Sequence, residues 1–520
     1  MVNRWLVGAL ALAFATASAP AGAAASHPMH PPKKRAPAGM HVPPAPPDAV
    51  TQHSVTINGK VYKYTARAGT ITLRNHKQQP TARMFYVAYT LNGANPSTRP
   101  VTFLYNGGPG SSTVWLRMGA VGPVRLVSKD GGITGPPPYQ LKKNPYSLLD
   151  KSDLVFIDAP GTGYGRLIGA GKPKEFYGVD QDVRAFAQFI DRYVTTYNRW
   201  NSPKFLFGES YGTTRSAALV NYMQMHDGMT FNGVVLQSSI LNFALDWATN
   251  FTPVSIGGGD WAYVLYLPSE AATAWYHHAI PNRPAHLQPF LQKVQKFAMG
   301  EYLHDLALGT KLSPAAYNDV VAKLHRYTGL SSHIIRINNL RVAYYRFEQQ
   351  LLLHDRKFVG RLDSRFEDYD IDGGESAPPW DPTDSAIDGV FTSTNMQYLR
   401  NDLHYKTNIP YRIVNYGKTL AHWDFKHNGM LPTNVAVDLA QAMTYNPNLK
   451  IYSANGYFDL ATPYLATVYT LQHLNINPAL QKNITFGFYH SGHMIYLHTA
   501  ALAQYKANLA RWYDMVLHRR

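Results

Sequence analysis

The chain has 520 residues, of which 45% are hydrophobic and 13% aromatic, enough to bury a sizeable core. Its formal net charge of +16 comes without a long basic run or a nucleic-acid-binding motif, so we favour a basic exported protein over one that binds nucleic acid. The sequence contains no cysteine, which excludes disulfide bonds.

The first 25 residues have the pattern of a secretory signal peptide. Arg4 supplies the positive start, an apolar run extends from Trp5 to Ala17, and small residues up to Ala25 offer cleavage sites. The run is shorter than the roughly 20 apolar residues of a membrane-spanning helix. We therefore expect an exported mature protein without a membrane anchor.

The rest of the chain divides by composition. Residues 26–50 are rich in proline, alanine and histidine, which predicts an extended linker. Residues 51–244 and 396–520 alternate between strand and helix patterns, as expected for two parts of one α/β core. Residues 245–395 lose this alternation and read as a largely helical insertion, with helices predicted at Ser269–His278, Leu287–Met299 and Ala315–Tyr327.

The first part of the core opens with strands. Val61–Tyr64, Met84–Thr90 and Val101–Tyr105 carry the β-branched and aromatic residues typical of paired strands. Asn92-Gly93 predicts a hairpin turn between the last two of them.

Two glycine-rich loops follow predicted strands. Residues 106–112 (N-G-G-P-G-S-S) come directly after Val101–Tyr105, and their small side chains let backbone N–H groups approach a ligand oxygen. Residues 158–165 follow the predicted strand Asp153–Ile157 but lack both the G-x-G-x-x-G spacing and the Walker lysine. We interpret both loops as lining an active-site cleft and expect no nucleotide cofactor.

The most informative stretch is Gly208-Glu209-Ser210-Tyr211-Gly212, which fits the G-x-S-x-G nucleophile elbow. A predicted buried strand, Lys204–Phe207, precedes it, and the helix-compatible stretch Thr213–Gln224 follows. The glycines permit a tight strand-to-helix turn that exposes the Ser210 hydroxyl. At a helix N-terminus, unpaired N–H groups favour the negative charge that develops during acyl transfer.

An acid and a histidine follow in the order that such an elbow requires. Asp459 comes after the predicted strand Leu449–Ser453, and His493 comes after the predicted strand Ile484–Tyr489. The carboxyl ends of parallel strands are where α/β sheets hold their chemistry. The order Ser–Asp–His is that of α/β-hydrolases and differs from those of two other serine hydrolase folds.

We expect no metal. The stretch Asp368–Gly373 imitates the start of a calcium loop, but Pro379 stands where that loop needs a glutamate. No zinc-ligand spacing such as H-E-x-x-H occurs.

Taken together, these segments resemble the serine carboxypeptidase family, peptidase family S10. Residues 106–112 resemble its N-G-G-P-G-C-S-S signature, residues 158–164 its D-x-P-x-G-x-G-[FY] loop, and residues 491–494 the surroundings of its catalytic histidine. The resemblance implies an α/β-hydrolase fold, a mixed, mostly parallel sheet flanked by helices, with the insertion forming a cap over the active site. Because eukaryotic secreted members usually carry disulfides, the lack of cysteine favours a bacterial enzyme, periplasmic or secreted.

The resemblance also implies a role for each matching residue. Ser210 would be the nucleophile, His493 the general base and acid, and Asp459 the residue that orients the imidazole. The backbone N–H groups of Gly108 and Tyr211 would form the oxyanion hole. The substrate's C-terminal carboxylate would be bound by Asn106, Gly107 and a protonated Glu209.

Three positions depart from the family pattern. Leu104 stands where the family usually has tryptophan, and Ser111 replaces the signature cysteine. Ala120 occupies the position of a second glutamate that usually pairs with the one before the nucleophile. We therefore expect a carboxypeptidase with peptide substrates and an acid pH optimum less extreme than that of relatives carrying the pair.

Two alternatives remain open at this stage. An acyltransferase or esterase would use the same Ser210, Asp459 and His493 but would not need a free carboxylate on its substrate. A non-catalytic binding module would keep the fold without reacting at Ser210, and labelling by a fluorophosphonate would exclude it. The sequence does not determine the oligomeric state or the preferred C-terminal residue.

Overall fold

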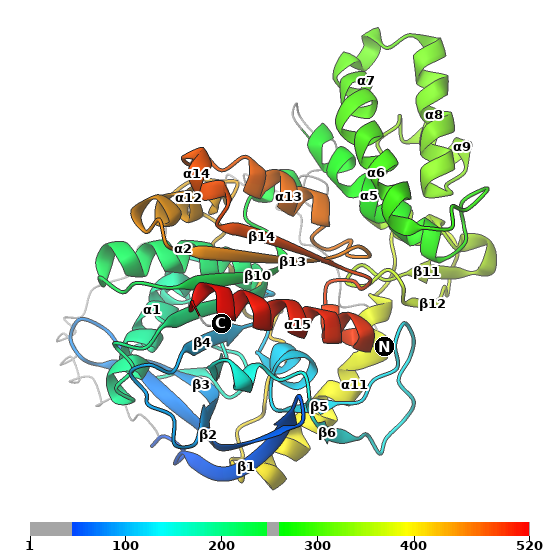
Figure 1. Ribbon diagram of the computed structural model, residues 1–520. Helices are drawn as coiled ribbons and strands as arrows, with labels where there is room; N and C mark the ends of the chain where they lie inside the picture. Colours follow the sequence, from blue (N-terminus) through cyan, green and yellow to red (C-terminus); the bar gives the residue numbers. More distant parts are fainter. Residues whose placement is uncertain (1–43, 247–258, 519–520) are drawn as a thin grey trace, which may run out of the picture. The chain divides into compact units, whose positions relative to one another are not determined.

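The computed structural model describes residues 44–246 and 259–518 (Figure 1). The expected signal peptide and most of the expected linker lie outside these ranges. Across the described residues, no helix combines the length and the apolar character that a membrane crossing requires.

A ten-stranded mixed sheet forms the core. Its strands are β1 (Ala49–Ile57), β2 (Lys60–Arg74), β3 (Pro80–Leu91), β4 (Val101–Tyr105), β7 (Asp153–Ile157), β8 (Arg166–Leu167), β9 (Lys204–Ser210), β10 (Gly233–Ser239), β13 (Lys450–Gly456) and β14 (Ile484–Tyr489). The order is β1-β2-β3-β7-β4-β9-β10-β13-β14, with β8 beside β3. The strands from β7 to β14 run parallel, whereas β1, β2, β3 and β7 pair antiparallel. This arrangement confirms the predicted mixed, mostly parallel sheet.

The predicted hairpin at Asn92-Gly93 is wrong. The strands before and after it, β3 and β4, are not neighbours, because β7 pairs with both and separates them. Asp153 at the start of β7 accepts a hydrogen bond from Leu91 N through Oδ1 (3.0 Å) and donates one from its own N–H to Pro100 O (2.9 Å). Another Asn-Gly pair, Asn58-Gly59, forms the turn that joins the antiparallel strands β1 and β2.

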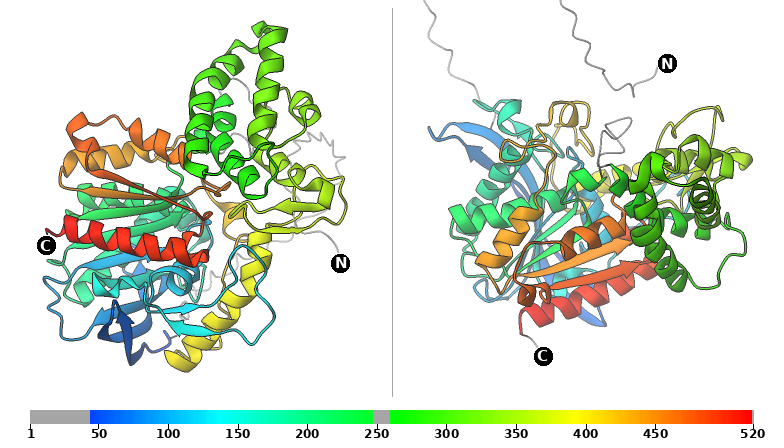
Figure 2. Two further views of the ribbon diagram at one scale, coloured as in Figure 1. Left: turned by 45° about the vertical axis from the view of Figure 1, so that its right-hand side comes forward. Right: turned by 90° about the horizontal axis from the view of Figure 1, so that it is seen from above.

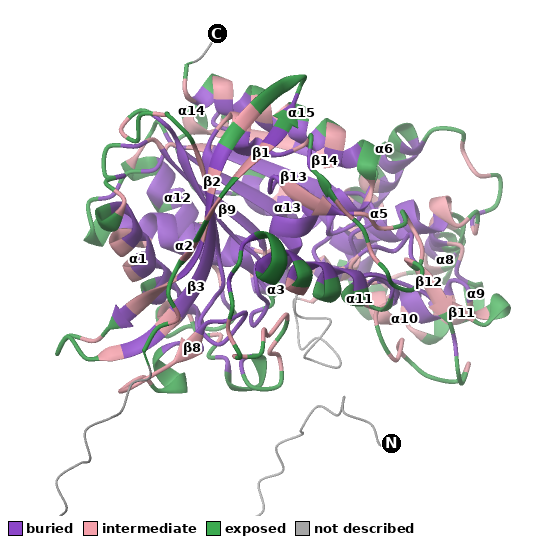
Figure 3. Cartoon of the chain, turned by 90° about the horizontal axis from the view of Figure 1, so that it is seen from below, coloured by how far each residue is buried: buried purple, intermediate pink, exposed green. Residues whose placement is uncertain are grey.

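Helices cover both faces of the sheet (Figures 1 and 3). The helices outside the insertion, together with α11 at its C-terminal end, are α1 (Val179–Thr196), α2 (Tyr211–His226), α3 (Phe243–Asp246), α11 (Pro382–Gln397), α12 (Ala436–Tyr445), α13 (Tyr464–Gln472), α14 (Pro478–Gln481) and α15 (Thr499–Val516). Side chains along a strand point alternately to opposite faces of the sheet, so successive residues of β9 pack against the helices on different faces. Phe205 and Phe207 pack in one cluster with Trp512 of α15, whereas Leu206 packs in the other with Phe186 of α1.

The insertion supplies most of a third hydrophobic cluster, which also includes Phe458 and Tyr464 after β13. Its helices are α5 (Asp260–Tyr276), α6 (Leu287–Phe297), α7 (Leu303–Leu308), α8 (Pro314–Thr328), α9 (Ser332–Ile337) and α10 (Tyr344–Gln350), followed by the small hairpin β11 (Lys357–Val359) and β12 (Glu367–Tyr369). Figure 2 shows α5 to α9 gathered into a separate group of helices. A second small hairpin, β5 (Val124–Leu126) with β6 (Leu141–Lys143), lies after the first glycine loop.

A buried ion pair joins three parts of the core. Arg215 on α2 is fully buried, and its Nε donates to Asp182 Oδ2 on α1 at 2.6 Å. Its Nη1 donates to Asn106 O at 2.9 Å, directly after β4. The guanidinium also lies 4.1 Å from the centre of the Phe186 ring. Helix α2 is thereby connected to α1 and to the first glycine loop.

We expect Arg215→Leu to lower the free energy of unfolding by about 3–5 kcal/mol, because it leaves the Asp182 carboxylate buried without its partner. Urea denaturation would measure the change. Arg184→Leu, an exposed arginine on the same α1 helix, is the matched control and should change stability by less than about 0.5 kcal/mol. Equal effects of the two substitutions would contradict the assigned importance of the ion pair.

Candidate active site

The predicted strand–turn–helix around Ser210 is confirmed. Ser210 ends β9 with φ 60° and ψ −133°, a backbone conformation that side-chain-bearing residues rarely adopt, and α2 begins at the next residue. A methyl group on Gly208 would lie 2.1 Å from Gly212 O, and one on Gly212 would lie 2.8 Å from Tyr105 O. Both outer positions of the elbow therefore require glycine for lack of space.

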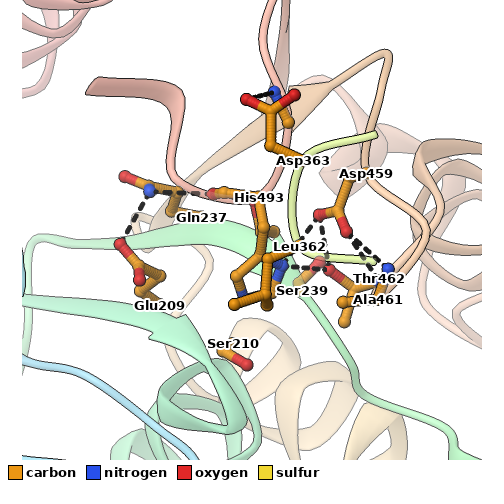
Figure 4. Close-up of polar contacts among 12 residues, drawn as sticks. Glu209, Ser210, Gln237, Ser239, Leu362, Asp363, Asp459, Ala461, Thr462 and His493 are labelled. Carbon is orange, nitrogen blue, oxygen red and sulfur yellow. Dashed lines mark hydrogen bonds and ion pairs between the residues drawn. The ribbon is translucent and has the colours of Figure 1, made fainter. Parts of the chain in front are cut away.

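His493 and Asp459 form a buried hydrogen-bonded pair. They follow β14 and β13, and His493 Nδ1 lies 2.9 Å from Asp459 Oδ2 (Figure 4). Asp459 Oδ1 accepts hydrogen bonds from the N–H groups of Ala461 and Thr462, both at 2.8 Å, and Oδ2 accepts one from the Thr462 hydroxyl at 2.8 Å. These donors fix the orientation of the carboxyl group toward the imidazole.

The backbone of His493 is held from two directions. Its N–H donates to Leu362 O at 2.7 Å, in the segment that joins β11 to β12 of the insertion. Its carbonyl oxygen accepts bonds from Ser238 Oγ at 2.7 Å and Gln237 Nε2 at 3.3 Å, both at the carboxyl end of β10. The insertion therefore contributes directly to the position of the histidine.

Ser210 belongs to the same site. In the view of Figure 4, Ser210 lies on the side of the imidazole away from Asp459, and its side chain is only partly buried. Within the described residues, no hydrogen bond joins Ser210 Oγ to His493. Such bonds are often long or poorly aligned before substrate binds.

Glu209, within the elbow, is buried and accepts three side-chain hydrogen bonds. Asn106 Nδ2 donates to Oε1 at 2.7 Å, Tyr496 OH donates to Oε1 at 3.2 Å, and Gln237 Nε2 donates to Oε2 at 2.8 Å. Burial, with a smaller contribution from Asp459, raises the pKa of Glu209 to about 7, although His493 and the hydrogen bonds from Tyr496 and Asn106 act in the opposite direction. Glu209 can therefore carry a proton near neutral pH even though Ala120 provides no second carboxylate.

The protonation of His493 depends on the same surroundings. Burial would lower the pKa of His493, but the Asp459 carboxylate and, to a smaller extent, Glu209 outweigh it, so the pKa is raised. The ionised form of Glu209 and the protonated form of His493 therefore stabilise each other.

The first glycine loop packs tightly on the elbow. A methyl group on Gly107 would lie 2.4 Å from Tyr211 N, and Gly108 adopts φ 106°. Ser111, at the position of the family's cysteine, accepts a hydrogen bond from Trp115 Nε1 at 2.8 Å. The second loop is joined to this region through Asp158, whose Oδ1 accepts a bond from Thr113 N at 2.7 Å.

The structure thus brings all the sequence-predicted site residues into one region at the carboxyl ends of the strands. It also adds residues that the sequence reasoning missed, namely Gln237, Ser238, Leu362, Thr462 and Tyr496. The polar run Gln237-Ser238-Ser239 at the end of an apolar strand was a usable signal. Leu362 acts through a backbone carbonyl and carries no signal in its side chain.

Sheet topology, elbow and the buried Asp–His pair define a protein of the α/β-hydrolase class. The pattern of the family described as "Serine carboxypeptidase" matches residues 60–486, and the chain belongs to this family.

Individual relatives are distant. The chain is 24% identical over 218 residues to serine carboxypeptidase-like 45 of Arabidopsis thaliana, covering 38% of this chain and 44% of the relative. It is 27% identical over 175 residues to carboxypeptidase Y homolog A of Phaeosphaeria nodorum, covering 33% of this chain and 30% of the relative. The similarity therefore spans less than half of the length of these relatives.

Among solved structures, the fold resembles Kex1(delta)p, a prohormone-processing carboxypeptidase from Saccharomyces cerevisiae. The TM-score is 0.53 at 17% identity, covering 87% of this chain and 90% of the yeast chain. At this identity the likeness concerns the fold alone.

Gly107→Ala should disrupt the contact between the first glycine loop and the elbow, because the added methyl group meets backbone atoms on both Tyr211 and Gly212. We expect a lower melting temperature and a loss of fluorophosphonate labelling. Gly300→Ala is the control, since nothing lies within 4 Å of its added methyl group. A Gly107→Ala protein with wild-type melting and labelling would refute the packing described.

Proposed function

We propose that this protein is a serine-type carboxypeptidase that removes C-terminal residues from peptides through an acyl-enzyme on Ser210. The observation that supports the proposal best is a protonatable, buried Glu209 directly before the nucleophile, close to a hydrogen-bonded Asp459–His493 pair. An ionised glutamate would repel a substrate carboxylate, whereas a protonated one can donate a hydrogen bond to it.

In the proposed reaction, Asn106, the Gly107 backbone and protonated Glu209 bind the terminal carboxylate of the peptide. Ser210 Oγ attacks the carbonyl carbon of the last peptide bond while His493 Nε2 accepts the hydroxyl proton. The Gly108 and Tyr211 N–H groups stabilise the oxyanion.

His493 then gives its proton to the departing amine, which leaves as the free C-terminal amino acid. Water, deprotonated by His493, attacks the acyl-enzyme, and the shortened peptide is released as Ser210 is regenerated. Asp459 orients the imidazole throughout.

We further propose the cellular context and the domain limits. Residues 1–25 would be cleaved on export to the periplasm or the medium of a bacterium, and residues 26–50 would serve as a linker. Residues 51–244 and 396–520 would form the catalytic core, with 245–395 as its cap. The substrates would be peptides, and the reaction would need no metal or organic cofactor.

A blocked dipeptide and the same dipeptide amidated at its C-terminus distinguish the proposed activity from an esterase or acyltransferase. We expect the wild-type kcat/KM to be at least roughly 10-fold higher for the free carboxylate, because the amide lacks the charge that Glu209 and Asn106 recognise. Equal rates for the two peptides, or cleavage of esters only, would support the alternative activity.

Ser210→Ala should lower kcat by roughly 10⁴-fold or more and abolish fluorophosphonate labelling, because the acyl-enzyme cannot form. Digestion of a mixed peptide library, followed by mass spectrometry, would show whether wild-type activity removes residues from one end. Full activity in Ser210→Ala would exclude the proposed nucleophile.

The pH dependence tests Glu209. Its protonated form binds the carboxylate, so kcat/KM for a free-carboxylate peptide should fall as the pH rises through about 7, the raised pKa of Glu209. The amidated peptide should lack this falling limb, as should Glu209→Gln with the free-carboxylate peptide. A wild-type profile that still rises at about pH 8 would remove Glu209 from this role.

A further inference from the structure

Tyr496 is a buried residue to which the proposed reaction gives no role. It lies three positions after His493, in the short helical turn Ile495–Leu497, and it is 1% exposed. Its hydroxyl contacts Glu209 Oε1 at 3.2 Å, the oxygen that also accepts a bond from Asn106. Tyr496 therefore connects the histidine loop to the residue directly before the nucleophile.

The partners of Glu209 differ in one chemical respect. Asn106 accepts a bond from Leu116 N through Oδ1 (3.0 Å), which turns its amide nitrogen toward Glu209. Gln237 likewise uses its nitrogen for both Glu209 and His493 O. Both amides can therefore only donate to Glu209. The tyrosine hydroxyl is the one partner in the described network that can donate to the carboxylate and accept from the carboxylic acid.

Packing holds that hydroxyl in place. The Tyr496 ring lies against the backbone of Gly119, where an added methyl group would come within 2.5 Å of ring Cδ2. Ala120 beside it is fully buried and brings no polar atom in its side chain. A ring confined in this way cannot readily turn its hydroxyl away from Glu209.

The titratable groups that face Glu209 come from several elements. Asp459 and His493 lie on the loops after β13 and β14, and Tyr505 faces it from α15. Tyr505 is buried, and its hydroxyl makes no hydrogen bond within the described structure. Tyr496 thus differs from Tyr505 by its direct bond to the carboxyl group.

We propose that Tyr496 is a positioning residue that holds the Glu209 carboxyl group through its hydroxyl and thereby sets the pH range in which a substrate carboxylate is bound. The proposal rests on the proposed carboxypeptidase function for its consequence in catalysis. Its physical basis, the coupling between Tyr496 and the proton on Glu209, does not depend on the substrate.

Tyr496→Phe removes a bond to either form of Glu209, but the bond to the ionised carboxylate is the stronger one, so the proton should be released at higher pH. We expect the falling limb of kcat/KM for a free-carboxylate peptide to move up by about one pH unit. Tyr505→Phe deletes a buried hydroxyl that Glu209 does not contact, and it should leave the limb in place. No shift in Tyr496→Phe, or equal shifts in both variants, would overturn the proposal.

Glu209→Gln provides a second comparison. If Tyr496 acts through Glu209, adding Tyr496→Phe to Glu209→Gln should not move the pH profile any further. A shift that persists in the double variant would assign Tyr496 another role. Thermal melting of each variant would verify that it is folded.

An infrared titration separates this inference from the proposed function. The protonated-carboxyl band that is present in wild type and absent in Glu209→Gln reports on Glu209 without any substrate. Its midpoint should rise in Tyr496→Phe and stay unchanged in Tyr505→Phe. If the midpoint rises but the protein cleaves no peptide, only the proposed function fails, whereas an unmoved midpoint in an active enzyme refutes the role of Tyr496.

Discussion

The site depends on a charge buried beneath it, the guanidinium of Arg215. One nitrogen binds Asp182 on α1 and another binds the carbonyl oxygen of Asn106, so the first glycine loop is attached to α2, the helix that begins directly after Ser210. The Asn106 side chain then reaches Glu209. A buried charge is tolerated only when it is paired and hydrogen-bonded, so this one also restricts how the three segments can be arranged.

The histidine side of the site is supported differently. His493 is held by main-chain and side-chain contacts from β10, by Asp459 after β13, and by Leu362 of the insertion. An insertion that was expected to form a cap thus helps to fix the position of His493. The two halves of the site meet at Glu209. The side-chain nitrogen of Gln237 donates one hydrogen bond to Glu209 and another to the carbonyl oxygen of His493.

Glu209 and His493 also interact electrostatically. In the proposed reaction, the carboxyl group must be protonated to bind a carboxylate, and the imidazole must be neutral to accept a proton from Ser210, yet ionisation of Glu209 favours the imidazolium. Two groups coupled in this way titrate as a pair. A hydroxyl that bonds to Glu209 therefore influences both protonation states.

Local patterns in the sequence were sufficient for the elbow at Ser210, the parallel strands that precede Asp459 and His493, and the class of fold, because glycine spacing and strand periodicity depend on neighbouring residues. They were insufficient for strand order. Asn92-Gly93 has the composition of a hairpin turn, but β7 lies between β3 and β4, a pairing set by residues some 60 positions away. Likewise, only the tertiary structure identified Tyr496 as a partner of Glu209 and Leu362 as a partner of His493. A hydrogen bond forms between groups that are close in space, and the packing of the whole chain decides which groups these are.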